Sequence, residues 1–133
     1  MNIPRIVAVT LLLAASGWSL RTVWAENRTE ESKMSNEKVI MLIEAKIQPA
    51  HRAELIEAAR HYLPLVRAEA GVEAFYLTAR QDDVNTFVFY EVYKSKTAQD
   101  FHFQQDFTKK FLETLKSAQV GDRNRTPLIE VAE

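Results

Sequence analysis

The chain has 133 residues, a length typical of a single domain. It contains no cysteine, which excludes disulfides, thiolate metal sites and cysteine nucleophiles. With 17 basic and 18 acidic residues the formal net charge is −1, so no basic excess is available to hold nucleic acid or an anionic membrane surface.

The first 25 residues have the pattern of a secretory signal peptide. A short start with Arg5 precedes the uncharged run 6–20, and Val23-Trp24-Ala25 resembles a small-residue cleavage site. The apolar run is short and wrongly flanked for a membrane span. We therefore expect cleavage after Ala25, a periplasmic or secreted protein, and no stable membrane insertion after processing.

Two alternatives to this processing stay open. The leader could be retained as an uncleaved anchor, because the bulky Trp24 is unusual inside a cleavage site. Alternatively, "MSNEKVIML" from Met34 is typical of a cytosolic start, and translation from there would give a cytoplasmic protein.

Residues 26–37 are polar and charged without an apolar period, which indicates a flexible linker before a domain at 38–133. The domain opens with the segment 39–47, which is apolar on both of its alternating sides. Such a pattern is typical of a strand that is buried on both faces.

A helix is expected to begin at Pro49, because proline fits a first helical turn. Its apolar residues recur at helical spacing: Leu55, Ala59, Tyr62 and Val66. Glu69-Ala70-Gly71 supplies the stop. Two strands at 72–79 and 86–93 follow, and the Asp- and Asn-rich turn "QDDVN" between them predicts a hairpin.

Ser95 is a suitable N-cap for a second helix, in which a break is expected near Gln105-Asp106. The inner face of this helix is predicted to consist of Ala98, Phe101, Phe103, Phe107, Phe111 and Leu115. A polar loop at 121–125 leads to a short last strand at 126–131, where Pro127 is tolerated near the start.

The predicted order is β-α-β-β-α-β, which is the ferredoxin-like α+β fold with a four-stranded antiparallel sheet and both helices on one face. The second face of the strands is also apolar. A single copy would leave that face in water, so we expect two sheets to pack face to face in a homodimer, forming an α/β barrel.

His102 is the histidine whose setting suggests chemistry. It lies between Phe101 and Phe103, where a neutral imidazole could accept a phenolic proton. Alternatively, a backbone carbonyl satisfies it and its role is structural. His51 and His61 are ten positions apart on one helix and cannot form a metal-binding pair, so no metal site is expected.

Glu91 is an acid in the aromatic stretch "FVFYEVY", where it shares one face of the strand with Tyr93. A carboxylate there must be hydrogen-bonded, paired, or raised in pKa. The alternative is a structural partner for Lys46 or for an arginine across the dimer. Glu44 on the first strand has the same two interpretations.

Four short motifs together resemble the antibiotic biosynthesis monooxygenase-like family of dimeric α/β barrels, which includes quinol monooxygenases. They are Glu44 five positions before Pro49 in "EAKIQP", "AEAGVEAFYL" after the first helix, "EVYKS" in place of the family's Glu-x-Trp-x-Ser, and His102 seven positions after Ser95. These motifs span nearly all of residues 38–131.

The resemblance implies a cavity between sheet and helices, and oxygenation of a small quinol or phenolic aromatic by O2 without a metal or other cofactor. His102 would be the base or hydroxyl anchor and Glu91 its orienter or a second polar contact. Tyr93 and Tyr76 would be cavity walls, with Glu44 as a further substrate-binding residue.

Haem degradation, known in some relatives, is disfavoured because the first strand has no asparagine and a processed chain has no tryptophan. Two other functions stay open on the same fold. One is a non-catalytic small-ligand-binding or stress-related dimer, and the other is an isomerase of a small carbonyl compound.

Overall fold

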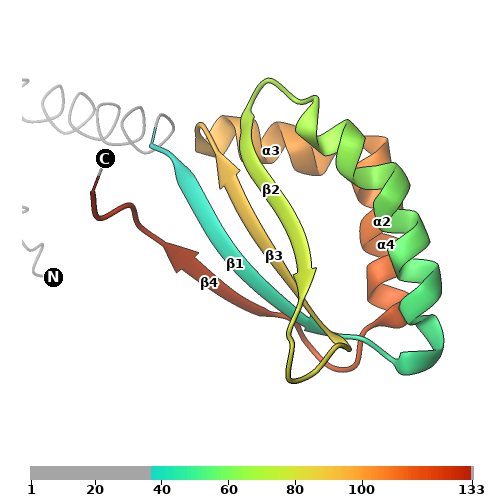
Figure 1. Ribbon diagram of the computed structural model, residues 1–133. Helices are drawn as coiled ribbons and strands as arrows, with labels where there is room; N and C mark the ends of the chain where they lie inside the picture. Colours follow the sequence, from blue (N-terminus) through green and yellow to red (C-terminus); the bar gives the residue numbers. More distant parts are fainter. Residues whose placement is uncertain (1–36, 133) are drawn as a thin grey trace, which may run out of the picture.

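The computed structural model describes residues 37–132, which form one antiparallel sheet covered on one side by helices (Figure 1). The elements in chain order are β1 (Val39–Lys46), the 3-10 turn η1 (Pro49–His51), α2 (Arg52–Arg67), β2 (Val72–Ala79), β3 (Thr86–Tyr93), α3 (Lys96–Gln104), α4 (Asp106–Ala118) and β4 (Asn124–Leu128). The expected leader and nearly all of the expected linker lie outside the described residues, so cleavage and secretion stay predictions.

The sheet has the strand order β2-β3-β1-β4, and all neighbouring strands are antiparallel. This confirms the predicted ferredoxin-like fold and the β2–β3 hairpin. Its last strand is shorter and earlier than expected, because β4 pairs with β1 only from Asn124, opposite Glu44, to Leu128, opposite Ile40. No helix within residues 37–132 is long and apolar enough to cross a bilayer.

The hydrophobic core lies between the sheet and the helices, and the strands contribute their odd-numbered residues to it. The register places Phe89 between Ile43 on β1 and Leu77 on β2. From the helix layer, Tyr62 stacks on Phe111 with ring centroids 4.1 Å apart and planes 4° from parallel. This stack joins α2 to α4, which run side by side (Figure 1).

The second helical region is divided at Gln105, as predicted, because Gln105 has an extended backbone with ψ 137°. The Ser95 N-cap is also confirmed, since its hydroxyl accepts the Ala98 N–H at 3.1 Å. The break separates α3 from α4, and α3 crosses one end of the helix layer (Figure 1).

The predicted inner face of α3 is wrong at two positions. Phe101 and Phe103 are 56% and 39% exposed, whereas His102 between them is only 1% exposed. Phe103 and Phe111 lie on opposite sides of the break at Gln105, and the break was predicted without the change of direction that it produces. Because the chain turns at Gln105, α3 instead directs Ala98 and His102, four positions apart, toward the sheet.

The sheet face away from the helices carries the even-numbered strand residues. Leu42 and Val88 are half-buried there, and Tyr90 is 37% exposed. In one copy of the chain this face has no covering layer among the described residues (Figure 1).

The turn after α2 packs directly against α3, and this contact yields a test of the fold. A Cβ at Gly71 would lie 2.6 Å from the Ala98 Cβ, which is too close for two carbons. We expect Gly71→Ala to lower the free energy of unfolding by about 1–3 kcal/mol through overpacking. Urea denaturation measures the change.

The double variant Gly71→Ala/Ala98→Gly is the control, because it removes the clashing methyl group. We expect it to lose clearly less stability than the sum of the two single variants. Strict additivity would show that the two residues are not in contact.

Candidate active site

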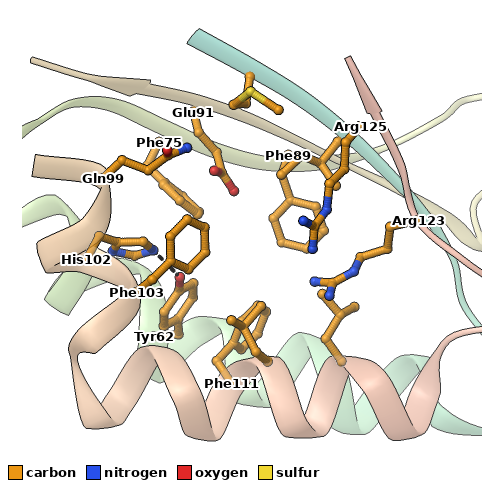
Figure 2. Close-up of a pocket in the computed structure, with 14 residues that line it drawn as sticks. Tyr62, Phe75, Phe89, Glu91, Gln99, His102, Phe103, Phe111, Arg123 and Arg125 are labelled. Atoms are coloured by element: carbon orange, nitrogen blue, oxygen red, sulfur yellow. Dashed lines mark hydrogen bonds between the residues drawn. The ribbon is translucent and has the colours of Figure 1, made fainter. Parts of the chain in front are cut away.

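A cavity of about 280 Å³ lies between the sheet and the helices (Figure 2). Its size is close to the lower end of the range for small-molecule sites, which suits a ligand of one ring. The lining consists of Met41, Ile43, Tyr62, Phe75, Phe89, Glu91, Gln99, His102, Phe103, Phe111, Leu112, Leu115, Arg123 and Arg125. Most of these side chains are apolar, and the polar ones come from both helical and strand segments, with Gln99 and His102 both on α3.

Both nitrogens of the buried His102 imidazole have partners. Its Nδ1 lies 2.7 Å from Oε1 of Glu69, whose side chain is only 7% exposed. Its Nε2 lies 3.0 Å from the Tyr62 hydroxyl (Figure 2). Because an ionised carboxylate can only accept, Nδ1–H donates to Glu69, and Nε2 accepts the Tyr62 proton. The result is a directed chain from tyrosine through histidine to glutamate.

The state of Tyr62 follows from its burial. Removal from water raises the pKa of the Tyr62 hydroxyl well above its ordinary value. Tyr62 therefore stays protonated at neutral pH and serves as the donor to His102. Its hydroxyl oxygen can still accept a hydrogen bond from a ligand, so Tyr62 can connect the cavity to the histidine.

Glu91 is the second polar centre of the cavity. Its side chain is buried, and Oε2 accepts a hydrogen bond from the Tyr93 hydroxyl at 3.0 Å. Burial raises the pKa of Glu91 to about 7, although the Tyr93 hydrogen bond and the positive charges of Arg125 and Arg123 act in the opposite direction. At neutral pH Glu91 can therefore act as an acid or as a base.

The structure brings Glu91 and His102 to one cavity, although their roles differ from the expectation. The residue that orients His102 is Glu69, not Glu91, because Glu69 makes the hydrogen bond to Nδ1. The partner of Glu91 is Tyr93 rather than Lys46, which pairs with Asp83.

Tyr93 packs against His102 behind the residues that line the cavity. It is fully buried, does not line the cavity, and its ring centroid lies 5.4 Å from that of His102. Its expected part as a cavity wall is therefore corrected to one of packing and hydrogen bonding to Glu91.

Tyr76 and Glu44 lie on the other face of the sheet, which corrects their expected place in this site. Both have even numbers in their strands, opposite the Phe75 and Ile43 face that lines the cavity. Tyr76 is 56% exposed, and Glu44 lies near Arg80 with an N···O distance of 3.7 Å.

Sequence reasoning missed Glu69, the donor role of Tyr62, and both arginines. Glu69 looked like part of a helix stop, and Tyr62 like a core residue. One signal was available, because a tyrosine on an apolar helix face needs a hydrogen-bond partner when it is buried. Arg123 and Arg125 were expected in a polar loop, yet the first precedes β4 and the second lies within it.

Within the part of the chain that the structure describes, no three His, Asp or Glu side chains gather in a way that could hold a metal ion. The polar groups of the cavity are instead arranged as one hydrogen-bonded chain, one carboxyl group, the amide group of Gln99 and two guanidinium groups. This arrangement can move protons and bind hydroxyl or acidic groups.

The fold and the cavity define a ferredoxin-like α+β protein with an aromatic-lined site. Residues 38–114 match the family model of the antibiotic biosynthesis monooxygenases, which is more than half of the chain. The chain therefore belongs to that family.

A relative from Synechocystis sp. is 25% identical over 84 residues. The match covers 63% of this chain and 57% of the relative, so the chain spans less than two thirds of that protein.

Solved structures show the same fold. A crystal structure described as an antibiotic biosynthesis monooxygenase has a TM-score of 0.67 and 20% identity, covering 71% of this chain and 99% of the other. The structure of a Mycobacterium tuberculosis protein has a TM-score of 0.67 and 21% identity, and the match covers 73% of this chain and 98% of the other. The structure of a Pseudomonas aeruginosa protein has a TM-score of 0.65 and 20% identity, and the match covers 74% of this chain and 98% of the other.

The raised pKa of Glu91 predicts a pH-dependent stability. Between its ordinary value of 4.5 and about 7, the unfolded chain ionises at this residue while the folded chain stays protonated. The free energy of unfolding should therefore fall by about 3 kcal/mol as pH rises through this window. Glu91→Gln, which cannot ionise, should lack this fall, as measured by urea denaturation across the pH range.

Glu113→Gln is the matched control, because Glu113 is an exposed carboxyl group on α4. Its stability curve should keep the wild-type dependence on pH. Parallel curves for wild type and Glu91→Gln would contradict the raised pKa.

Proposed function

We propose that the protein is a cofactor-independent oxygenase that uses O2 to oxidise a small hydroquinone-like aromatic. The observation that carries this proposal is the chain from Tyr62 through His102 to Glu69, which begins at an aromatic-lined cavity. The family match supports monooxygenase chemistry. The substrate class rests on the geometry of the cavity.

Substrate binding would use the aromatic lining. Phe75, Phe89, Phe103 and Phe111 surround the space between Glu91 and the helix layer (Figure 2). A flat ring fits between such side chains through stacked and edge-to-face contacts. Exclusion of water by these rings also strengthens the hydrogen bonds that the hydroxyl groups of the substrate make.

The first step is removal of a phenolic proton. The substrate hydroxyl donates to the Tyr62 oxygen, while the Tyr62 proton moves to Nε2 of His102. The carboxylate of Glu69 stabilises the imidazolium that forms, because it accepts from Nδ1 at 2.7 Å. The substrate thus gives its proton to the neutral Tyr62 hydroxyl, and no ionised base has to contact the substrate.

The resulting phenolate is electron-rich and passes one electron to O2, which gives a semiquinone radical and superoxide. These combine at a ring carbon, and the peroxide takes back the proton held by His102. Loss of the proton from that carbon then breaks the O–O bond and releases hydroxide, which leaves as water. Hydroquinone and O2 thus become hydroxyquinone and water, with all four electrons supplied by the substrate.

Glu91 is suited to the second proton transfer. A pKa of about 7 allows it to accept the proton of the peroxide-bearing carbon and to return it to the departing hydroxide. Its hydrogen bond from Tyr93 fixes the carboxyl group while it changes its protonation state.

Oxygen uptake with a panel of hydroquinones tests the proposal. We expect turnover above autoxidation in metal-chelated buffer, and a loss of kcat by about 10²–10⁴-fold in Tyr62→Phe, His102→Ala and Glu69→Gln, since each interrupts proton transfer. Tyr76→Phe is the control, because Tyr76 lies on the other sheet face.

Three results would count against the proposal. Ring binding without oxygen uptake would indicate a non-catalytic ligand-binding protein. Turnover of a carbonyl compound without consumption of O2 would indicate an isomerase. Uptake that is unchanged in Tyr62→Phe and His102→Ala would remove the proposed proton route.

We also propose that two copies of the chain pack through the open sheet face. Leu42, Val88 and Tyr90 form an apolar surface there that one copy leaves uncovered among the described residues. We expect the wild type to sediment as a dimer and Leu42→Lys to sediment as a monomer, because a charge would be buried at the interface.

Leu65→Lys is the matched control for this experiment. Leu65 is 47% exposed on α2, on the helix side of the molecule, so this variant should stay dimeric. A monomeric wild type, or a dimer that Leu42→Lys leaves intact, would contradict the proposed interface.

A further inference from the structure

Arg123 and Arg125 place two positive charges in the wall of the cavity. The register explains this position, because Arg125 pairs with Ile43, whose side chain also lines the cavity. Arg123 is two positions earlier and lines the same space. Both guanidinium groups point into the cavity, on the side opposite Tyr62 and His102 (Figure 2).

The two guanidinium groups have no counter-ion among residues 37–132. Every ion pair within 4.0 Å in this part of the chain involves other cations. The acid that shares the cavity with them is Glu91, which is hydrogen-bonded to Tyr93 instead. The arginines are therefore available to a ligand.

The electrostatics of the wall support the same conclusion. Burial lowers the pKa of Arg123, and the positive charge of Arg125 acts in the same direction. Arg123 is half-buried and Arg125 is exposed, so a charge partly removed from water lies beside a second charge of the same sign, and an anion bound between them would relieve both costs. Glu91 does not fill this role when it is protonated, and its pKa of about 7 keeps it largely protonated in mildly acidic solution.

We propose that the cavity binds an aromatic acid, with the carboxylate held by Arg123 and Arg125 and the ring hydroxyl directed to Tyr62. The planar forks of two arginines match a carboxylate, which each of them can bind through paired N–H groups. The aromatic side chains between the two ends then hold the ring. This inference deepens the proposed function, on which it rests for the ring hydroxyl and for the reaction.

The arginines lie outside residues 38–114, the stretch that matches the family model. The family match therefore carries no information about this end of the cavity. The assignment depends on the β4 register and on the residues that line the cavity in this chain.

Binding of non-oxidisable probes tests the inference separately from catalysis. Phenylacetate and its neutral analogue phenylacetamide have nearly the same shape. We expect phenylacetate to bind at least about tenfold more tightly by isothermal titration calorimetry at about pH 6 and low salt, where the probe is ionised. Added salt should weaken the binding of phenylacetate and leave that of phenylacetamide unchanged.

Substitution of each arginine shows whether it causes the tighter binding of phenylacetate. Arg123→Gln and Arg125→Gln should each weaken phenylacetate binding by about tenfold and leave phenylacetamide binding unchanged. Arg125→Lys should give an intermediate loss, because lysine keeps the charge and loses the fork. Arg80→Gln is the charge-matched control, since Arg80 pairs with Asp82 outside the cavity and should have no effect. Thermal unfolding verifies that each variant is folded.

The outcomes separate this inference from the proposed function. Equal affinity for the acid and the amide, or loss of acid binding only in Arg80→Gln, would overturn the inference, even if hydroquinones were oxidised. Arginine-dependent binding of phenylacetate without any oxygen uptake would support the acid-binding end and contradict the oxygenase. With both correct, (2,5-dihydroxyphenyl)acetate should have a lower KM than its methyl ester, and Arg125→Gln should remove the difference.

Discussion

The site depends on one buried hydrogen bond, between Nδ1 of His102 and the carboxylate of Glu69. An imidazole that is 1% exposed must have partners for both nitrogens, and this bond determines which nitrogen carries the proton. Once Nδ1 donates, Nε2 can only accept, so Tyr62 becomes a donor and the chain acquires a direction. The bond also ties the turn after α2 to α3, two segments that are 33 residues apart in sequence.

The cavity combines two electrostatic environments that serve different purposes. At one end the neutral Tyr62 donates to His102, and the other nitrogen of His102 is hydrogen-bonded to the carboxylate of Glu69. At the other end Arg123 and Arg125 form no ion pair with an acidic side chain among the described residues. Glu91 lies between these ends and is close to its midpoint of ionisation at neutral pH. An aromatic acid of the proposed kind would be held in one orientation, because its anionic group is attracted to the arginines and its ring hydroxyl can hydrogen-bond to Tyr62.

Local patterns predicted the fold well and the site only in part. The strands at 72–79 and 86–93 were predicted with their observed bounds, because alternation and an Asp-rich turn determine both strands and turn locally. His102 and Glu91 were predicted as site residues because a polar group in an aromatic segment requires an explanation. Glu69 could not be found in this way, since its partner is distant in sequence. The exposure of Phe103 depended on a change of helix direction that side-chain spacing does not encode.

The close approach of Gly71 to Ala98 has a consequence for acid–base chemistry as well as for packing. Gly71 follows Glu69 by two positions, and Ala98 precedes His102 by four positions, so both lie next to the ends of the Glu69–His102 bond. A larger residue at either position would push the turn away from α3 and lengthen that bond. The Nδ1–H group of His102 would then be held less firmly, and Nε2 would be less well aligned with the Tyr62 hydroxyl. Gly71 and Ala98, two of the smallest residues, thereby determine the geometry of a hydrogen-bonded chain to which neither contributes a side-chain hydrogen bond.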